Sequence, residues 1–137
     1  MNVFFYVPVT DKADEIISKV VDMIAPTVRT EVFHSVAVLS DRLCRPAGNP
    51  AITVLFIPGR GELLEVVSRR DLLSETSIVL ILPDREEGTT SAAHTLRPRF
   101  MTCLDAELAE VRMVLERMIE NQRRNEAIEE WRNEWNL

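Results

Sequence analysis

The chain has 137 residues, of which 46% are hydrophobic and 28% are charged, and its formal net charge at pH 7 is −6. This length and composition predict one folded domain with a buried core. The acidic balance argues against a nucleic-acid partner, because phosphate backbones select basic surfaces.

The first half of the chain alternates strand signals with helix signals. Residues 3–9 (VFFYVPV) are aromatic and β-branched, which predicts a strand that ends near Pro8. Residues 10–25 place apolar side chains at helical spacing behind residues that can cap a helix. A second strand is predicted over 31–35 and a second helix over 36–45.

The second half of the chain continues the alternation. Residues 52–57 form a run that is apolar on both faces, as central parallel strands are. Gly59 and Gly61 are predicted to make the turn into the next helix. The remaining elements are a strand over 77–83, a short weak helix over 84–96, a strand over 97–104 and a long helix from Asp105 onward.

Five strands that alternate with five helices predict right-handed βαβ crossovers and a parallel sheet with helices on both faces. For a domain of this size the expected arrangement is an α/β, three-layer, doubly wound fold of the flavodoxin-like type. Its five-stranded parallel sheet would have the strand order 2-1-3-4-5. The functional crevice of such sheets lies beyond the carboxyl ends of the strands, so those ends are the candidate site.

The order and spacing of the elements, together with the segment IPGRGELLEVV over 57–67, resemble the receiver domain of bacterial response regulators. Receivers carry an acidic pair after the first strand, a phospho-accepting aspartate in the third, a Ser or Thr after the fourth and a lysine after the fifth. The resemblance implies that none of these groups is present here. Pro8 and Val9 stand in the place of the acidic pair, and Val54, Leu55 or Phe56 in that of the phospho-accepting aspartate. Leu82 stands in the place of the Ser or Thr, and Thr102 or Cys103 in that of the lysine.

The absence of these groups predicts a degenerate receiver, or pseudo-receiver. Mg²⁺ needs oxygen ligands, and phosphoryl transfer depends on positioning and charge neutralisation around that metal. Apolar strand ends supply neither, so we expect a non-enzymatic signalling or scaffold module without a cofactor that works by protein–protein interaction. In receivers the partner surface is formed by the fourth helix, the fifth strand and the fifth helix, which here would include Arg97 and Arg99.

Two alternatives use the same strand ends for small ligands. The chain could be a small flavodoxin-like ligand-binding protein or enzyme with a crevice near Pro8, Gly59 and Pro83. Gly59, Arg60 and Gly61 could hold an anion at a helix start, although glycines in such a position are usually turn residues. A flavin is disfavoured, because the loop after the first strand has one threonine and no glycine.

The last helix divides the chain into a receiver-like domain over 1–121 and a helical extension over 122–137. The apolar stripe predicted to pack on the sheet consists of Leu108, Val111, Leu115, Met118 and Ile119. Residues 121–126 are wholly polar, and the apolar pattern then restarts and includes Trp131 and Trp135, one turn apart on one face.

Three roles for this extension remain open on the sequence alone. It could fold back on its own domain, dock as an arm on a second copy or another protein, or lie on a membrane surface. Its glutamates oppose attraction to anionic lipid, and tryptophans are enriched where protein surfaces associate. A short arm that pairs symmetrically into a homodimer is easier to defend than a long coiled coil, because the heptad is not sustained.

The ends and the cysteines give an expectation for location. The start of the chain has no basic leader and too short an apolar run for a signal peptide. No segment approaches the roughly 18 apolar residues needed to span a membrane. Cys44 and Cys103 form neither a disulfide framework nor a metal-ligand pattern. We therefore expect a cytoplasmic protein without membrane insertion.

Overall fold

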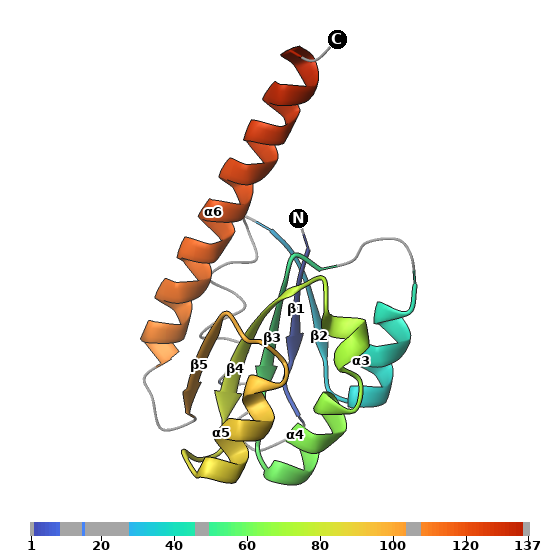
Figure 1. Ribbon diagram of the computed structural model, residues 1–137, viewed down its shortest axis with the longest axis vertical. Helices are drawn as coiled ribbons and strands as arrows, with labels where there is room; N and C mark the ends of the chain where they lie inside the picture. The colour runs from blue at the N-terminus through green and yellow to red at the C-terminus, as the bar shows by residue number, and fades with distance from the viewer. Residues whose placement is uncertain (1, 9–14, 16–27, 46–49, 104–107, 136–137) are drawn as a thin grey trace.

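The computed structural model describes residues 2–8, 15, 28–45, 50–103 and 108–135. These residues form one five-stranded, wholly parallel sheet in the order β2-β1-β3-β4-β5, with helices packed against it (Figure 1). The predicted flavodoxin-like topology and the long C-terminal helix are therefore confirmed. None of the helices in the described residues is both long enough and apolar enough to cross a bilayer.

Each described element lies within a few residues of the segment predicted for it. The strands are β1 (Asn2–Tyr6), β2 (Arg29–Phe33), β3 (Ile52–Phe56), β4 (Ser77–Leu82) and β5 (Phe100–Cys103). The helices are α3 (Val36–Leu43), α4 (Arg60–Val67), α5 (Glu87–His94) and α6 (Leu108–Trp135), with a short 3₁₀ helix, η2 (Arg70–Leu73). The helix predicted over 10–25 lies outside the described residues, apart from Glu15, which is helical.

Three boundaries differ from the predictions for local reasons. β1 ends at Tyr6 rather than near Pro8, which has no N–H to donate to a ladder. β5 begins at Phe100 rather than at 97, because Arg97 has a positive φ of 52° and closes the turn behind α5. α4 begins at Arg60, so Gly61 lies within the first helical turn instead of in the connecting turn.

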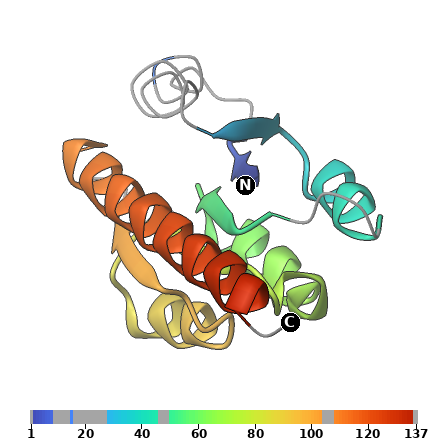
Figure 2. The same cartoon turned by 90° about the horizontal axis from the view of Figure 1, so that it is seen from above.

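The sheet separates two apolar clusters, and β3 contributes to both. Val54 and Phe56 face the cluster covered by α6, whereas Leu55 and Ile57 face the cluster covered by α3, α4 and α5 (Figure 2). Successive side chains of a strand point to opposite faces, so a strand in the middle of three layers must be apolar at every position. The two-sided apolar pattern that predicted a central strand is thus explained.

α6 packs on the sheet through the predicted stripe. Val111, Leu115 and Ile119 are buried in the cluster beneath this helix, and Met118 packs at its margin. The prediction for the side chain of Leu108 lies outside the described part of the structure. The stripe fixes the first third of α6 against the sheet and thereby sets the direction in which the rest of the helix extends.

Candidate functional site at the carboxyl edge of the sheet

The candidate site is the edge at which the carboxyl ends of the parallel strands meet. The register pairs Tyr6 with Leu55, Phe56 with Ile81, and Leu82 with Cys103, so the ends of four strands lie side by side. Val54, Leu55 and Phe56 are at most 2% exposed, and Leu82 and Cys103 are also buried. The positions assigned to the receiver's aspartate and hydroxyl therefore belong to the apolar core.

The remaining positions assigned from the receiver resemblance lie at the margin of this edge. Pro8 is half-buried just beyond β1, and Thr102 is half-buried in β5. Val9 and Asp11, which the sequence places at the same edge, lie outside the described residues. Among the residues that the structure describes, no cluster of three or more His, Cys, Asp and Glu side chains could hold a metal ion.

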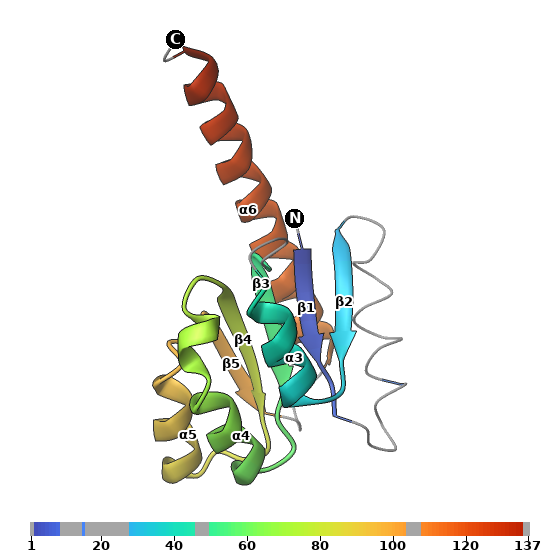
Figure 3. The same cartoon turned by 90° about the vertical axis from the view of Figure 1, so that its right-hand side faces the viewer.

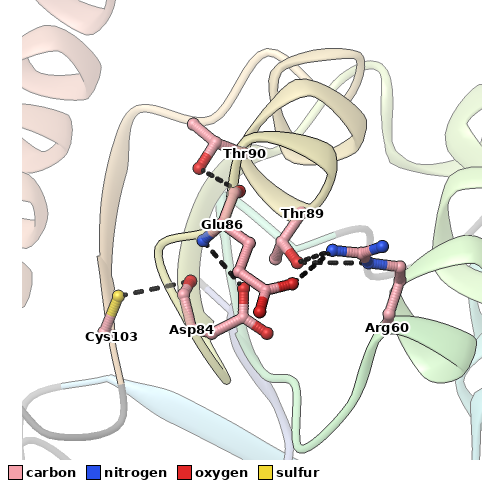
Figure 4. A network of polar contacts seen from close by, with 6 residues as sticks. All are labelled: Arg60, Asp84, Glu86, Thr89, Thr90 and Cys103. Carbon is pink, nitrogen blue, oxygen red and sulfur yellow. Dashed lines mark hydrogen bonds and ion pairs between the residues drawn. The ribbon is translucent and has the colours of Figure 1, made fainter.

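Asp84 is the acid that directly follows β4, and it organises the turn into α5 (Figure 4). Its Oδ1 accepts the backbone N–H of Glu86 at 3.0 Å, and its carbonyl oxygen accepts the thiol of Cys103 at 3.5 Å. This is the turn-forming role in which aspartate is favoured. The contact with Cys103 also ties the end of β5 to this turn.

Arg60 bridges the starts of α4 and α5 (Figure 4). Its Nη2 donates to Glu86 Oε2 at 2.8 Å, and its Nε and Nη2 donate to Thr89 Oγ1 at 3.3 and 3.2 Å. Gly88 permits this approach, because a Cβ there would lie 3.2 Å from the guanidinium. A side chain at position 88 would therefore require the guanidinium to shift by a few tenths of an ångström.

The hydroxyl of Thr89 joins the arginine to the aspartate. Thr89 is fully buried, and its hydrogen bond to Asp84 is the largest cause that holds the pKa of that carboxyl below its usual range. The backbone N–H of Glu86 and the positive charge of Arg60 act in the same direction. Asp84 is thus ionised at neutral pH, and its oxygens accept hydrogen bonds from within the turn.

Tyr6 provides a second tie between a strand end and a helix start. Its side chain is 3% exposed, and its hydroxyl donates to Glu62 Oε2 at 2.9 Å. Burial raises the pKa of Tyr6 well above its usual range, and the hydrogen bond to Glu62 and the charges of Glu62 and Glu65 raise it further. The phenol is therefore a neutral donor that anchors α4 to the end of β1.

Sequence reasoning did not identify Tyr6, Glu62, Glu86 or Thr89 as part of this edge. Each contact joins residues far apart in the chain, 56 positions in the case of Tyr6 and Glu62. The chain's single tyrosine at a predicted strand end and the acids near two helix starts were visible signals. Which acid meets which donor depends on how α4 and α5 are placed, and no local pattern encodes that.

The predicted anion site at the start of α4 has a different geometry from the one expected. Gly59 precedes the helix in an extended conformation, and a Cβ added to Gly59 or Gly61 would meet no atom within 4 Å. Neither position therefore requires glycine for a close approach. The guanidinium of Arg60 is directed to α5, where an anion would have to compete with Glu86; anion binding stays a prediction.

Of the predicted interaction residues, Arg97 and Arg99 are exposed in the turn between α5 and β5. Arg97 adopts the left-handed conformation, directly before Pro98, and its N–H bonds the carbonyl of His94. A non-glycine residue in this region is strained by about 1–2 kcal/mol. Trp131 is exposed on α6, and the prediction for the side chain of Trp135 lies outside the described part.

A small cavity opens at the carboxyl end of β5, whereas Arg97 and Arg99 lie before the amino end of this strand. It has a volume of about 260 Å³ and is lined by Leu82, Asp84, Arg85, Thr90, Met101, Thr102 and Cys103. Ligand pockets for drug-sized molecules and cofactors usually measure about 300–1,000 Å³. The cavity is therefore suited to one or two side chains of a partner better than to a cofactor.

Replacing Thr89 with valine tests the bridge at its buried centre. We expect Thr89→Val to lower the free energy of unfolding by about 1–2 kcal/mol. Valine has nearly the shape of threonine, but it lacks the hydroxyl that bonds Arg60 and Asp84. The pKa of Asp84 should rise at the same time, as followed by NMR titration of the carboxyl carbon. Thr90 is the matched control, because its hydroxyl only bonds the carbonyl of Glu86 near the surface. Thr90→Val should change stability by less than about 0.5 kcal/mol, and an equal loss in both variants would contradict the bridge.

Comparison with known proteins supports the fold of this chain but does not assign it to a family. No family model matches the sequence, and no curated protein matches it. Five chains among the solved structures match, and one of them is a CheY-like response regulator from Mesorhizobium loti, with a TM-score of 0.64 and 15% sequence identity. The alignment covers 85% of this chain and 97% of that one. The chain therefore has a receiver-like fold, as the sequence resemblance predicted.

Proposed function

We propose that this protein is a cytoplasmic pseudo-receiver, a signalling or scaffold module that binds other proteins and does not accept phosphate at the receiver position. The observation that carries the proposal is the buried, apolar end of β3, where Phe56 is 2% exposed. A receiver needs an exposed aspartate there. The receiver-like fold supports the class of protein, and the residues at the strand ends support the loss of its chemistry.

The chemistry of phosphoryl transfer makes this loss consequential. Mg²⁺ is usually held by one or two carboxylates together with water and phosphate oxygens, and the metal neutralises the developing charge. At this edge Asp84 and Glu86 accept hydrogen bonds from the turn and from Arg60, and Glu62 accepts one from Tyr6. Recruiting them for a metal would break the contacts that hold α4 and α5 in place.

The partner surface that we propose is the face formed by α5, β5 and the first turns of α6. It has a basic turn before the amino end of β5, with Arg97 and Arg99, and the cavity of about 260 Å³ at the carboxyl end of the same strand. An arginine held in a strained backbone conformation suggests that its side chain is retained for binding, since glycine would remove the strain. A partner segment with an acidic residue and a small apolar side chain would complement this face.

The alternative, a flavodoxin-like ligand-binding protein or enzyme, has less support at the same edge. The small cavity beside β5 is the feature that favours it, and Asp84, one of the polar residues that line this cavity, is already bonded within the turn. A flavin or nucleotide would need a larger pocket than 260 Å³ and donors for its phosphate. We therefore retain protein binding as the proposed role.

Incubation with acetyl phosphate and Mg²⁺, followed by intact-mass spectrometry, tests the proposal. We expect no addition of one phosphoryl group to the native protein under conditions that label a functional receiver run in parallel. A stable addition would overturn the proposal. If one were found, peptide mapping would show whether it lies at this edge or on a surface side chain.

A photo-crosslinking residue at position 99 tests the proposed face in an extract of the native host. We expect a discrete protein adduct that is lost when Arg97 is changed to glutamate. The same crosslinker at Leu64, which is 54% exposed on α4, is the matched control and should give no such adduct. Equal capture from both positions, or none from position 99, would contradict the assignment of the face.

A further inference from the structure

The second half of α6 extends beyond the domain. We call residues 121–135 the arm. α6 runs as a single helix from Leu108 to Trp135, and it continues past the end of the sheet (Figures 1 and 3). The alternative in which the extension folds back on its own domain is therefore wrong for the described residues. Ile128 is 49% exposed and Trp131 is 60% exposed, which are high values for such apolar side chains.

The apolar residues of the arm lie on the opposite side of α6 from the stripe that packs on the sheet. That stripe includes Leu115 and Ile119, which are buried. Ile128 follows Ile119 by nine residues, which is about two and a half turns, and Trp131 follows Leu115 by sixteen residues, which is close to four and a half turns. The two groups therefore face in nearly opposite directions, and a straight helix cannot place both on its own sheet.

Charge changes sign along the arm. Residues 121–125 carry two arginines and no acid, whereas residues 126–135 carry four glutamates and one arginine. Two arms side by side in parallel would therefore bring arginines to arginines and glutamates to glutamates. Two antiparallel arms would bring the basic half of each to the acidic half of the other, so the arm is electrostatically complementary to an inverted copy of itself.

The face that carries Ile128 and Trp131 also carries two arginines, which lie about one to four turns earlier in the helix. Arg124 lies four residues before Ile128 and seven before Trp131, and Arg117 lies a further seven residues back, so all four share one side of the helix. Arg124 is exposed and pairs with Glu120 on the same helix at 2.9 Å. In an antiparallel overlap of 121–135 the stem of Arg124 would lie beside the partner's Trp131, where a guanidinium can also stack on an indole ring. Arg117 lies outside this overlap.

We propose that the arm binds the arm of a second copy of this chain in the antiparallel orientation. The overlap of 121–135 with itself gives about 22 Å of paired helix. This pairing places Ile128 against its counterpart at the centre of the overlap and Trp131 beside Arg124 of the second copy. It leaves the two domains at opposite ends of the dimer. The α5–β5–α6 face of each copy stays open, so the pairing does not depend on whether that face binds a partner.

Reversing the charges of the arm, first in one half and then in both halves of the same chain, tests whether two arms bind each other and whether they are antiparallel. The native chain should show a concentration-dependent dimer in sedimentation-equilibrium ultracentrifugation. Changing Arg123 and Arg124 to glutamate, or Glu129 and Glu130 to arginine, should weaken the dimer about tenfold or more, because each change sets like charges opposite each other. All four changes in one chain should restore the dimer, since the two halves are complementary again. In a parallel pair like charges would stay opposite each other in every variant, so the fourfold variant would dimerise no more tightly than the two double variants.

The apolar contact has its own variant and control. Trp131→Ala should weaken the dimer about tenfold or more, whereas Leu64→Ala, at a similarly exposed position on α4, should leave it unchanged. A monomer at all concentrations, or a fourfold variant that stays monomeric while the native chain dimerises, would overturn the proposal. Either result would leave the phosphodonor experiment unaffected, so failure of the arm and failure of the pseudo-receiver assignment are separable.

Discussion

Replacing Phe56 with aspartate, the residue that a receiver carries near this position, is expected to destabilise the fold by more than about 5 kcal/mol. Removing a buried phenylalanine side chain costs about 3–5 kcal/mol, and an ionised carboxylate in an apolar cluster adds several more. Domains of this kind are stable by about 5–15 kcal/mol. We therefore expect Phe56→Asp to be largely unfolded, as measured by circular dichroism and urea titration.

Two further variants separate the charge from the loss of packing. Phe56→Leu keeps an apolar side chain and should cost no more than about 1–2 kcal/mol. Pro58→Asp places the same carboxylate two residues later, where the chain is exposed, and should change stability by less than about 1 kcal/mol. If Phe56→Asp folded as stably as the native protein, the carboxylate would have found water or a cation, and the end of β3 would be open to solvent.

The reason for this expectation is the same one that supports the pseudo-receiver proposal. An aspartate that accepts phosphate must be reachable by water, metal and donor, whereas Phe56 fills space between the sheet and α6. Its burial contributes to folding through the area it removes from water. Packing at the end of β3 and phosphoryl chemistry at the same place are therefore mutually exclusive uses of one position.

The features that sequence predicted are those governed by local periodicity. The continuous apolar runs around Val54 and Val79 predicted strands buried on both faces, and the alternation of such strands with helices predicted the three-layer fold. The spacing of Val111, Leu115 and Ile119 likewise predicted which side of the last helix meets the sheet. Strand order then followed from the topology that is common for this size of domain.

The features that sequence could not predict are those that depend on tertiary placement. Arg60 was considered as part of an anion site, but its guanidinium reaches Thr89 on the next helix. A residue of α4 can meet α5 only once both helices lie on the same face of the sheet. Gly88 was passed over as an ordinary helix residue, although a side chain there would crowd Arg60. Arg97 in a left-handed conformation is a similar case, because only the turn around it requires that backbone.

Three ties now describe how the carboxyl edge is held. Tyr6 links β1 to α4, Arg60 links α4 to α5, and the thiol of Cys103 links β5 to the turn before α5. Each tie has at least one buried partner, Tyr6, Thr89 or Cys103, so the loss of the other partner costs free energy. The polar atoms of this edge therefore hold the helix starts to the strand ends.

The second large effect that we expect is a loss of stability at high pH that comes from Tyr6. A tyrosine ordinarily titrates near pH 10, and burial together with Glu62 raises the pKa of Tyr6 in the folded protein. The stability due to this group is complete below about pH 10, where the unfolded chain is also protonated. Above that pH the unfolded state loses its proton first, so stability should fall by about 1.4 kcal/mol per pH unit until the folded-state pKa is reached.

The measurement is unusually direct because Tyr6 is the only tyrosine in the chain. Phenolate absorbance should be absent from the folded protein when free tyrosine is already ionised, and it should appear together with the loss of circular dichroism. Tyr6→Phe should cost about 1 kcal/mol at neutral pH by losing the bond to Glu62, and it should remove this part of the pH dependence. Glu62→Gln should shift phenolate formation in the folded protein to lower pH, since it removes a charge that opposes ionisation. Phenolate formation near pH 10 in the fully folded protein would mean that the end of β1 is open to water, and it would undercut the picture of a closed edge on which the pseudo-receiver proposal rests.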